Sequence, residues 1–465
     1  MSDSGRQRRG ARGWLLAASV AVLSSLVLAA NALSAEEPTI FNLAPAMHAR
    51  GVTIGPDGNL WFAGTSSSGS RTPGAVGRVE PDGRVVEFGL QESSGAAAIV
   101  AGPDGNLWFT EPIAGRIGRV AVGGAIVTFP LPRPDSRPTG IAAGSDGNLW
   151  FTEYAGDRIG RITPAGAIAE FSLAAGSKPA GIVAGPDGNL WFTERGANRI
   201  GRITPAGRIA EFRLSGANPR PHAIAVGPDG NLWFGSEGAN RIGRITPAGA
   251  IDEFPVPLQN GTEAIAAGPD GNLWFSSYGR VGAIAPDGRL ARLTCLKGGC
   301  RLPVLSLTAG TGGEIWAGTS TEYFGGGGGT YINTNLTQPG YLARFVPRSS
   351  TTELTSGPRP VRSRRTRLQL SCGSAAGCHG VLRLTRQRAV YPGESGANYS
   401  VVTIGQGRYD LDPGGRASVL VRLNRRGAKL LANRPLTAWA LAEPGGGDLE
   451  TARLVTLRRA VKRVP

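Results

Sequence analysis

Residues that bind transition metals are scarce in this sequence. Its 465 residues include three histidines and four cysteines. The one place where they gather, Cys372, Cys378 and His379, lacks a fourth ligand and has the wrong spacing for zinc. This disfavours a Cys/His metal centre. If the chain is exported, its cysteines are expected to form disulfides, and the short separations predict the local pairs Cys295–Cys300 and Cys372–Cys378, although other pairings remain open.

Long apolar runs are also missing, except near the N-terminus. Four arginines up to Arg12 precede the apolar run from Trp14 to Ala30, and small residues follow at Ser34 and Ala35. This order predicts a signal peptide over residues 1–35 and a secreted or cell-surface protein. The run is close to the minimum length for crossing a bilayer, so an uncleaved membrane anchor is the alternative.

Lysine is almost absent, and the basic charge is unevenly distributed. The net charge is +16, but 20 basic and only 6 acidic residues lie in the last 108 residues, 358–465. Four alternating stretches there predict a small basic β-sandwich-like domain: Thr366–Ser371, Val381–Thr385, Ser418–Leu423 and Leu454–Leu457. This domain resembles the Ig-like C-terminal modules of exported proteins. A nucleic-acid partner is not expected for an exported chain without aromatic interleaving. An anionic cell-wall polymer or membrane surface is the expected partner, with a merely solvated basic surface as the alternative.

The dominant feature is a repeated block, Gly-Pro-Asp-Gly-Asn-Leu-Trp-Phe. It occurs with few changes from Gly55 onward and is degenerate at Gly310, giving seven copies in all. Their tryptophans are 41 to 47 residues apart, which is the length of four short strands with turns. Helical periodicity is absent. The sequence therefore predicts an all-β protein, a seven-bladed β-propeller over residues 36–357.

One blade can be divided into its strands. Residues 223–226 and 232–235 flank the Asp229-Gly230 turn, and residues 241–245 and 251–254 follow as the third and outer strands. Thr39–Leu43 has the pattern of an outer strand but precedes the first blade. We therefore expect it to complete blade seven by pairing near Thr351–Leu354 and to close the ring, because a closed ring has no free edge.

The same turn predicts which residues meet at the mouth of the channel. If each hairpin centres on its Asp, residues seven before and seven after face each other at the end opposite the turn. One rim would then carry two basic side chains and four carboxylates, together with two serines, as a ligand-binding surface. The expected pairs are Arg50 with Gly64, Ala97 with Glu111, Thr139 with Glu153, Ala180 with Glu194, His222 with Ser236, Glu263 with Ser277, and Leu305 with Thr319.

Two features of this rim also have an explanation that involves no ligand. The Glu that follows Trp-Phe-Thr in three blades is alternatively a repeat consensus with no ligand role. His48 is expected at the surface. In blade seven, Gly325–Gly329 between aromatic residues lengthens the loop after the second strand, either as a mobile cover for a ligand or as a tolerated insertion.

The repeated block, followed by Arg-Ile-Gly-Arg-Ile-Thr-Pro-Ala-Gly, resembles the virginiamycin B lyase (streptogramin lyase) family. The resemblance extends over all seven blades. It implies a magnesium-dependent elimination that opens the ester of a cyclic depsipeptide antibiotic without hydrolysis.

The resemblance also implies which residues carry the chemistry. Arg220-Pro221-His222 matches the first catalytic motif of the family, whereas the second motif, Glu-Pro-His, is replaced by Gly261-Thr262-Glu263. Elimination requires a base on the acidic proton and a cation for the developing charge. Glu263 could replace the missing His only with a raised pKa. We therefore expect a monomer that binds a small molecule or peptide in its channel through His222 and Glu263, with an active lyase that uses altered residues as the alternative.

Overall fold

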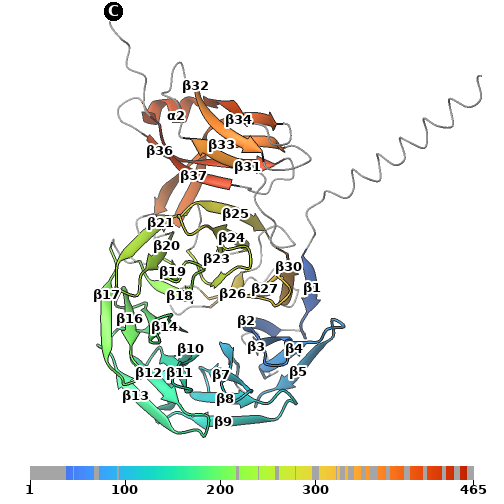
Figure 1. The fold of residues 1–465 in the computed structure, drawn as a ribbon, viewed down its shortest axis with the longest axis vertical. Helices are drawn as coiled ribbons and strands as arrows, with labels where there is room; N and C mark the ends of the chain where they lie inside the picture. Colours follow the sequence, from blue (N-terminus) through green and yellow to red (C-terminus); the bar gives the residue numbers. More distant parts are fainter. Residues whose placement is uncertain are drawn as a thin grey trace, which may run out of the picture. The chain divides into compact units, whose positions relative to one another are not determined.

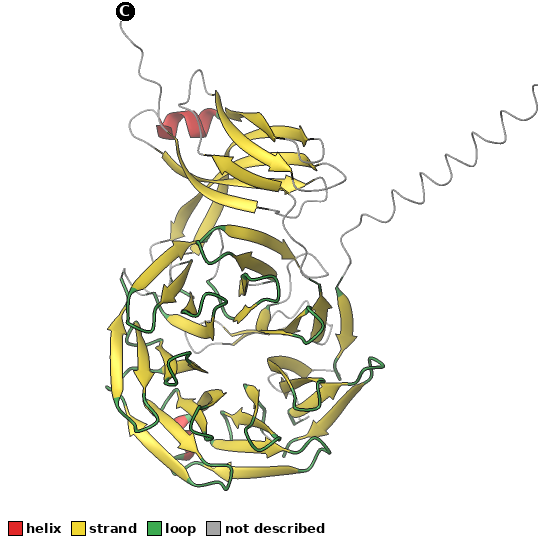
Figure 2. Cartoon of the chain, in the orientation of Figure 1, coloured by secondary structure: helices red, strands yellow, loops and turns green. Residues whose placement is uncertain are grey.

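The computed structural model describes residues 38–457 with gaps, and it is almost entirely built of β-strands (Figures 1 and 2). The signal peptide predicted over residues 1–35 lies outside the described part, which begins at residue 38. Within the described residues, no helix is long and apolar enough to cross a membrane. The gaps are 45–46, 67–72, 92–93, 216–218, 239, 257–260, 278, 296–302, 321, 325–329, 333–339, 347–351, 357–364, 373–377, 392–397, 412–415, 432–435 and 445–450.

Residues 39–345 form consecutive four-stranded antiparallel units, which confirms the predicted β-propeller fold. The first four units contain β2 (Met47–Ile54), β3 (Leu60–Ser66), β4 (Ala75–Val79) and β5 (Val85–Gly89); β6 (Ile99–Ala101), β7 (Leu107–Glu111), β8 (Arg116–Val120) and β9 (Ile126–Pro130); β10 (Pro138–Ala143), β11 (Leu149–Glu153), β12 (Arg158–Ile162) and β13 (Ile168–Ser172); and β14 (Pro179–Ala184), β15 (Leu190–Glu194), β16 (Arg199–Ile203) and β17 (Ile209–Arg213). A 3-10 turn, η2 (Pro134–Ser136), precedes β10.

Three more units complete the series. They contain β18 (Pro221–Val226), β19 (Leu232–Ser236), β20 (Arg241–Ile245) and β21 (Ile251–Pro255); β22 (Ile265–Ala267), β23 (Leu273–Ser277), β24 (Arg280–Ile284) and β25 (Leu290–Cys295); and β26 (Val304–Ala309), β27 (Ile315–Thr319), β30 (Tyr341–Phe345) and β1 (Thr39–Asn42). Each inner strand contacts the inner strand of the next unit, and β26 contacts β2 in turn, so the series is closed. A small hairpin of β28 (Glu322–Phe324) and β29 (Thr330–Ile332) lies between β27 and β30 in sequence, and the glycines that join it are outside the described residues.

The repeated block builds the core of each blade. In blade two, the carboxylate of Asp104 accepts hydrogen bonds from Trp108 Nε1 at 2.9 Å and from the Asn106 side chain at 2.9 Å. The indole is fully buried and packs against the next blade. Gly102 is required here because a Cβ would lie 2.4 Å from Trp108 Cδ1. The motif is therefore explained by packing and hydrogen bonding alone.

The strand β1 closes the propeller, but its partner differs from the prediction. It pairs with β30, from Thr39↔Arg344 to Asn42↔Tyr341, so β1 is itself the outer strand of blade seven. The predicted pairing near Thr351–Leu354 is wrong, because residues 352–356 form β31 and pair with β32. The third strand of this blade thus accepts the N-terminal strand directly.

The outer-strand Phe41 of blade seven packs less closely than the equivalent Phe of blades one to five. In five blades the core Trp and the outer-strand Phe are stacked, with interplanar angles of 16–20°, whereas Phe41 and Trp316 are tilted by 38°. A Cβ added to Gly124 would lie 2.2 Å from the Phe88 ring, but one at Gly83 would lie 3.5 Å from Phe41. A cavity of about 390 Å³ opens beside Phe41 and Trp316.

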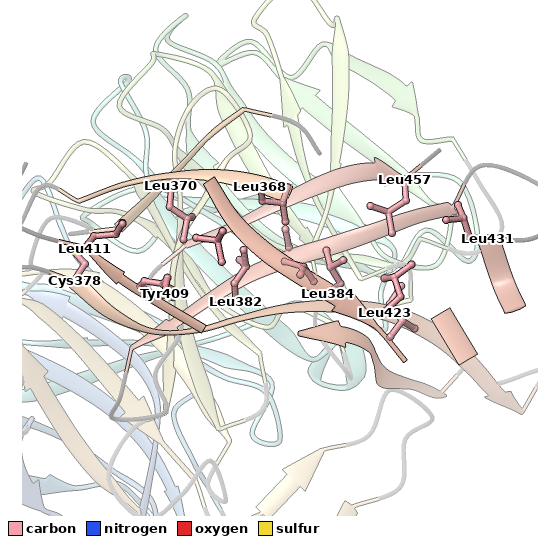
Figure 3. Close-up of a cluster of buried hydrophobic side chains, with 14 residues drawn as sticks. Leu368, Leu370, Cys378, Leu382, Leu384, Tyr409, Leu411, Leu423, Leu431 and Leu457 are labelled. Carbon is pink, nitrogen blue, oxygen red and sulfur yellow. The ribbon is translucent and has the colours of Figure 1, made fainter. Parts of the chain in front are cut away.

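The C-terminal strands are antiparallel and have their own apolar core (Figure 3), and the pair Leu290↔Ala452 joins them to β25 in one sheet. The four stretches predicted there as strands fall within β32, β33, β35 and β37, whereas β34, β36 and the helix were not predicted. A sandwich arrangement stays a prediction. The elements are β31 (Thr352–Ser356), β32 (Arg365–Cys372), β33 (Cys378–Tyr391), β34 (Asn398–Leu411), β35 (Arg416–Leu423), α2 (Arg425–Leu431), β36 (Leu436–Pro444) and β37 (Thr451–Leu457).

No cysteine among the described residues is free. Cys378 lies in the C-terminal core and is 5% exposed. Cys300 is outside the described part, and both predicted disulfide pairings stay predictions.

Candidate functional site

The inner hairpins meet at the predicted end, but their register differs by one residue. Glu153 faces Pro138 instead of Thr139, and Ser236 faces Pro221 instead of His222. A β-bulge before Ile141 and before Ile224 places an extra residue on the inner strand. The predicted pairing is therefore wrong by one residue in every blade whose printed strand pairing reaches the rim. The other three such pairs are Ala49↔Gly64, Pro179↔Glu194 and Val304↔Thr319.

The consensus glutamates do not face an open surface. Glu111, Glu153 and Glu194 are fully buried. Arg116 Nε and Nη2 donate to the two carboxylate oxygens of Glu111, each at 2.9 Å. Glu111 therefore belongs to a structural ion pair inside blade two. This agrees with the alternative that the repeated Glu is a consensus residue with no ligand role.

Glu153 lacks such a pair, and a neighbouring residue explains why. In blade three the equivalent arginine, Arg158, lies 3.7 Å from Glu170 on the outer strand. Blade two has Thr128 at the position of Glu170, so its arginine has no competing carboxylate there. In blade four, Arg199 pairs with Glu211 in the same way, beside Glu194.

Among the described residues, no group makes a hydrogen bond of normal geometry to the buried carboxylate oxygens of Glu153 and Glu194, although Ser136 and Ser177 lie close enough to oppose the rise in pKa. Burial is the main cause that raises the pKa of each to about 7. Both groups therefore hold a proton over much of the neutral range. Their predicted ligand-binding role stays a prediction.

His222 and Glu263 come together as expected. His222 Nδ1 lies 3.2 Å from the backbone oxygen of Glu263, and the imidazole is 42% exposed. Burial raises the pKa of Glu263 to about 8, and the charge of Glu237 adds to this, while Arg50 and Arg195 oppose it. His222 therefore offers an accessible imidazole next to the backbone of Glu263, whose carboxyl is protonated at neutral pH.

The central charge of the site was missed by the sequence analysis. Glu237 Oε1 lies 4.0 Å from His222 Nε2, and its Oε2 accepts hydrogen bonds from Arg195 Nε at 3.1 Å and Nη2 at 2.7 Å. Arg195 also donates to the Tyr154 hydroxyl at 2.9 Å, and Arg220 lies 3.7 Å from Glu237. Burial opposes ionisation, but His222, Arg195 and Arg220 hold the pKa of Glu237 below its usual value.

The cluster residues from the second strands occupy the same position in the repeat. Tyr154, Arg195 and Glu237 each come directly after the consensus Glu or its substitute, at a position that changes from blade to blade. Each is partly exposed, whereas the Glu or Ser before it is buried. In a repeat, the variable position next to a constant core position is the one that is not needed for packing. That contrast could have identified them.

The remaining predicted residues are placed as follows. Ser236 and Ser277 are buried at the ends of their strands, and Arg50 is partly buried in β2 close enough to act on Glu263. The prediction that His48 lies at the surface is wrong, because its side chain is fully buried. Strand β2 is longer than the other inner strands and continues past the rim.

The residues present do not fit magnesium, which prefers several carboxylate oxygens and water. Glu237 is already engaged by Arg195 and faces Arg220. Gly261, where the family motif has Glu, has φ +73°, and an added Cβ would lie 2.3 Å from Glu237 Cα. Within the described residues, no group of three or more His, Cys, Asp and Glu could hold a metal. Guanidinium groups supply the positive charge here.

Comparison with known proteins identifies the family. The family profile described as Virginiamycin B lyase family matches residues 39–325. A solved streptogramin B lyase is 33% identical, with a TM-score of 0.57 over 66% of this chain and 97% of that one. A catalytically inactive histidine-to-alanine variant of virginiamycin B lyase from Staphylococcus aureus with quinupristin is 31% identical, with a TM-score of 0.58 over 67% and 99%. No curated protein matches. The chain belongs to the virginiamycin B lyase family.

Proposed function

We propose that this chain is an exported family member that binds a ligand at the mouth of its propeller channel and does not perform the metal-dependent elimination. The cluster of His222, Glu237 and Arg195 carries this proposal, because it combines an accessible imidazole with a largely buried, hydrogen-bonded ion pair. Binding sites of this kind need few polar groups, provided that they are held rigidly. The second catalytic motif lacks both its Glu and its His.

A second candidate, an active lyase with altered residues, has one observation in its favour. The raised pKa of Glu263, about 8, lies in the range that suits a general base near neutral pH. In that reaction the Glu263 carboxylate would remove a proton from the carbon adjacent to the one that bears the ester oxygen. A carbon–carbon double bond would form as the carbon–oxygen bond breaks and a carboxylate is released.

The two candidates are separated by incubation with a streptogramin B-type depsipeptide. Elimination gives a linear isomer of equal mass, so the products are followed by chromatography. We expect the ring to stay intact with or without magnesium, because loss of a positioned base alone costs about 10²- to 10⁴-fold. We also expect calorimetry to detect binding that weakens in His222→Ala. Wild-type turnover that disappears in Glu263→Gln would establish the second candidate instead.

The double variant Gly261→Glu, Glu263→His serves as a structural control for this assay. Because a side chain at position 261 would meet the backbone of Glu237, we expect the family residues not to restore elimination. Recovery of turnover in this variant would contradict the steric argument.

For the basic C-terminal region, we propose binding to an anionic cell-wall or membrane surface. Its charge is carried mostly by arginine. We expect the full chain to be retained on purified cell-wall polymer at low salt and released as salt rises, because exposed charges are screened, whereas a chain ending at residue 357 should not be retained. Retention that is independent of salt would contradict this proposal.

A further inference from the structure

Threonine hydroxyl groups join three blades to the blades that follow them. Each hydroxyl donates to a backbone oxygen at the start of the next inner strand, at 2.6–2.8 Å. The donor and acceptor residues are Thr110 and Thr139, Thr152 and Ala180, and Thr193 and His222. The backbone of His222 is therefore held in place by blade four.

Blade five differs, because Gly235 occupies the position of the threonine. The equivalent acceptor in blade six is the backbone oxygen of Glu263, and position 235 has no side chain to donate to it. A Cβ added to Gly235 would lie 2.7 Å from Thr262 Cγ2 and 2.8 Å from Thr262 Cβ. The segment before β22 thus fills the space that a threonine side chain at position 235 would need.

The ring of His222 takes the place of the missing hydroxyl. Its Nδ1 lies 3.2 Å from the backbone oxygen of Glu263. A carbonyl oxygen can only accept a hydrogen bond, so the proton of the neutral imidazole is on Nδ1, and Nε2 is left as an acceptor. Nε2 lies 4.0 Å from Glu237 Oε1, and 42% of the His222 side chain is exposed. The ring is therefore oriented by blade six and open to a ligand.

We propose that Gly235 is a positioning residue for His222: it leaves the Glu263 carbonyl to the Nδ1–H group and so keeps Nε2 as a hydrogen-bond acceptor. The ligand group that contacts His222 is then an N–H or O–H donor, not a carbonyl or a carboxylate. The neighbouring Glu237 carboxylate is also an acceptor, and it favours the same kind of ligand group. This inference rests on the proposed ligand-binding function and specifies its chemistry at His222.

The first experiment reads the tautomer in the full chain without its predicted signal peptide. The sequence has three histidines, so the ¹⁵N resonances of the His222 ring are assigned by comparison with His222→Ala. At about pH 9, well above the ordinary pKa of histidine, we expect the proton on Nδ1 and none on Nε2. A proton on Nε2, alone or together with one on Nδ1, would overturn the inference.

The second experiment restores the hydroxyl that blade five lacks. Two double variants, Gly235→Thr with Thr262→Gly and Gly235→Val with Thr262→Gly, have side chains of equal shape at position 235 and the same space beside them. Only the threonine can donate to the Glu263 carbonyl. We expect the Nε2–H tautomer to appear in the threonine variant alone. This variant should bind the streptogramin B-type depsipeptide about two- to tenfold more weakly than the valine variant, which is the range for one neutral hydrogen bond.

The same tautomer in both double variants would overturn the role of Gly235. If neither variant folds, the tautomer of the wild-type chain decides alone. Failure of this inference is distinct from failure of the proposed function, because the tautomer is measured in the free protein. The proposed function fails instead if the wild-type chain does not bind the depsipeptide, or binds it equally well in His222→Ala.

Discussion

Deletion of residues 36–45 should lower the free energy of unfolding of the propeller by roughly 5 kcal/mol, because the deletion removes the burial of Phe41 and Leu43 and several ladder hydrogen bonds. Leu43 is 4% exposed and packs with Trp316 and Leu342. The amide of Ala44 donates to Glu87 in blade one at 3.0 Å. Loss of β1 also leaves β30 as a free edge. Chemical denaturation of the truncated and full-length chains measures the effect.

Thr39→Ala is the control for this deletion, because Thr39 lies in the same strand with an exposed side chain. We expect it to change the unfolding free energy by less than about 0.5 kcal/mol. An unfolding midpoint that is the same with and without residues 36–45 would show that β1 does not hold the ring closed.

Replacement of Glu153 or Glu194 by glutamine should stabilise the protein at pH 8 and leave it nearly unchanged at pH 4. Both residues have a folded-state pKa of about 7, above the ordinary value of the carboxyl. Their contribution to stability is therefore fully present below about pH 4.5 and is lost as the pH rises through 7. Above that pH, each ionised group costs up to about 3 kcal/mol, from 1.36 kcal/mol per pKa unit. Unfolding free energies at the two pH values test this.

Glu111→Gln provides the opposite case in the same position of blade two. It breaks a buried pair with Arg116, and we expect a loss of about 3 kcal/mol at pH 8. A further variant, Glu170→Thr, should free Arg158 to pair with Glu153 and lower the pKa of Glu153. If Glu153→Gln and Glu111→Gln were equally destabilising at pH 8, the pairing explanation would be wrong.

The propeller could be predicted from the sequence because its core is made of local interactions. Asp104, Asn106 and Trp108 satisfy one another within five residues, so each blade carries its own pattern. The predicted strands of blade five agree with β18–β21 to within two residues. Ring closure by β1 was predicted, but its partner strand was not. A pairing between strands far apart in the sequence has no local sequence pattern.

The site could be predicted less well. The bulge before Ile224 shifts the pairing near the rim by one residue, and Glu237 lies one position beyond Ser236, where the count from the turn ended. A bulge is set by packing between neighbouring blades and not by the turn from which the register was counted. His222 and Glu263 were also identified by comparison with the family motifs, which does not depend on strand register.

The position of β1 also has a kinetic consequence. Its partner β30 is about 300 residues further along the chain, and contacts of such high sequence separation form late, because a long loop must close before they contribute. The six blades before β30 can assemble one after another from neighbouring segments, but β1 has no partner until Tyr341–Phe345 has emerged. The first strand of the propeller is therefore the last to pair. During synthesis it remains unpaired until nearly the whole propeller has been made.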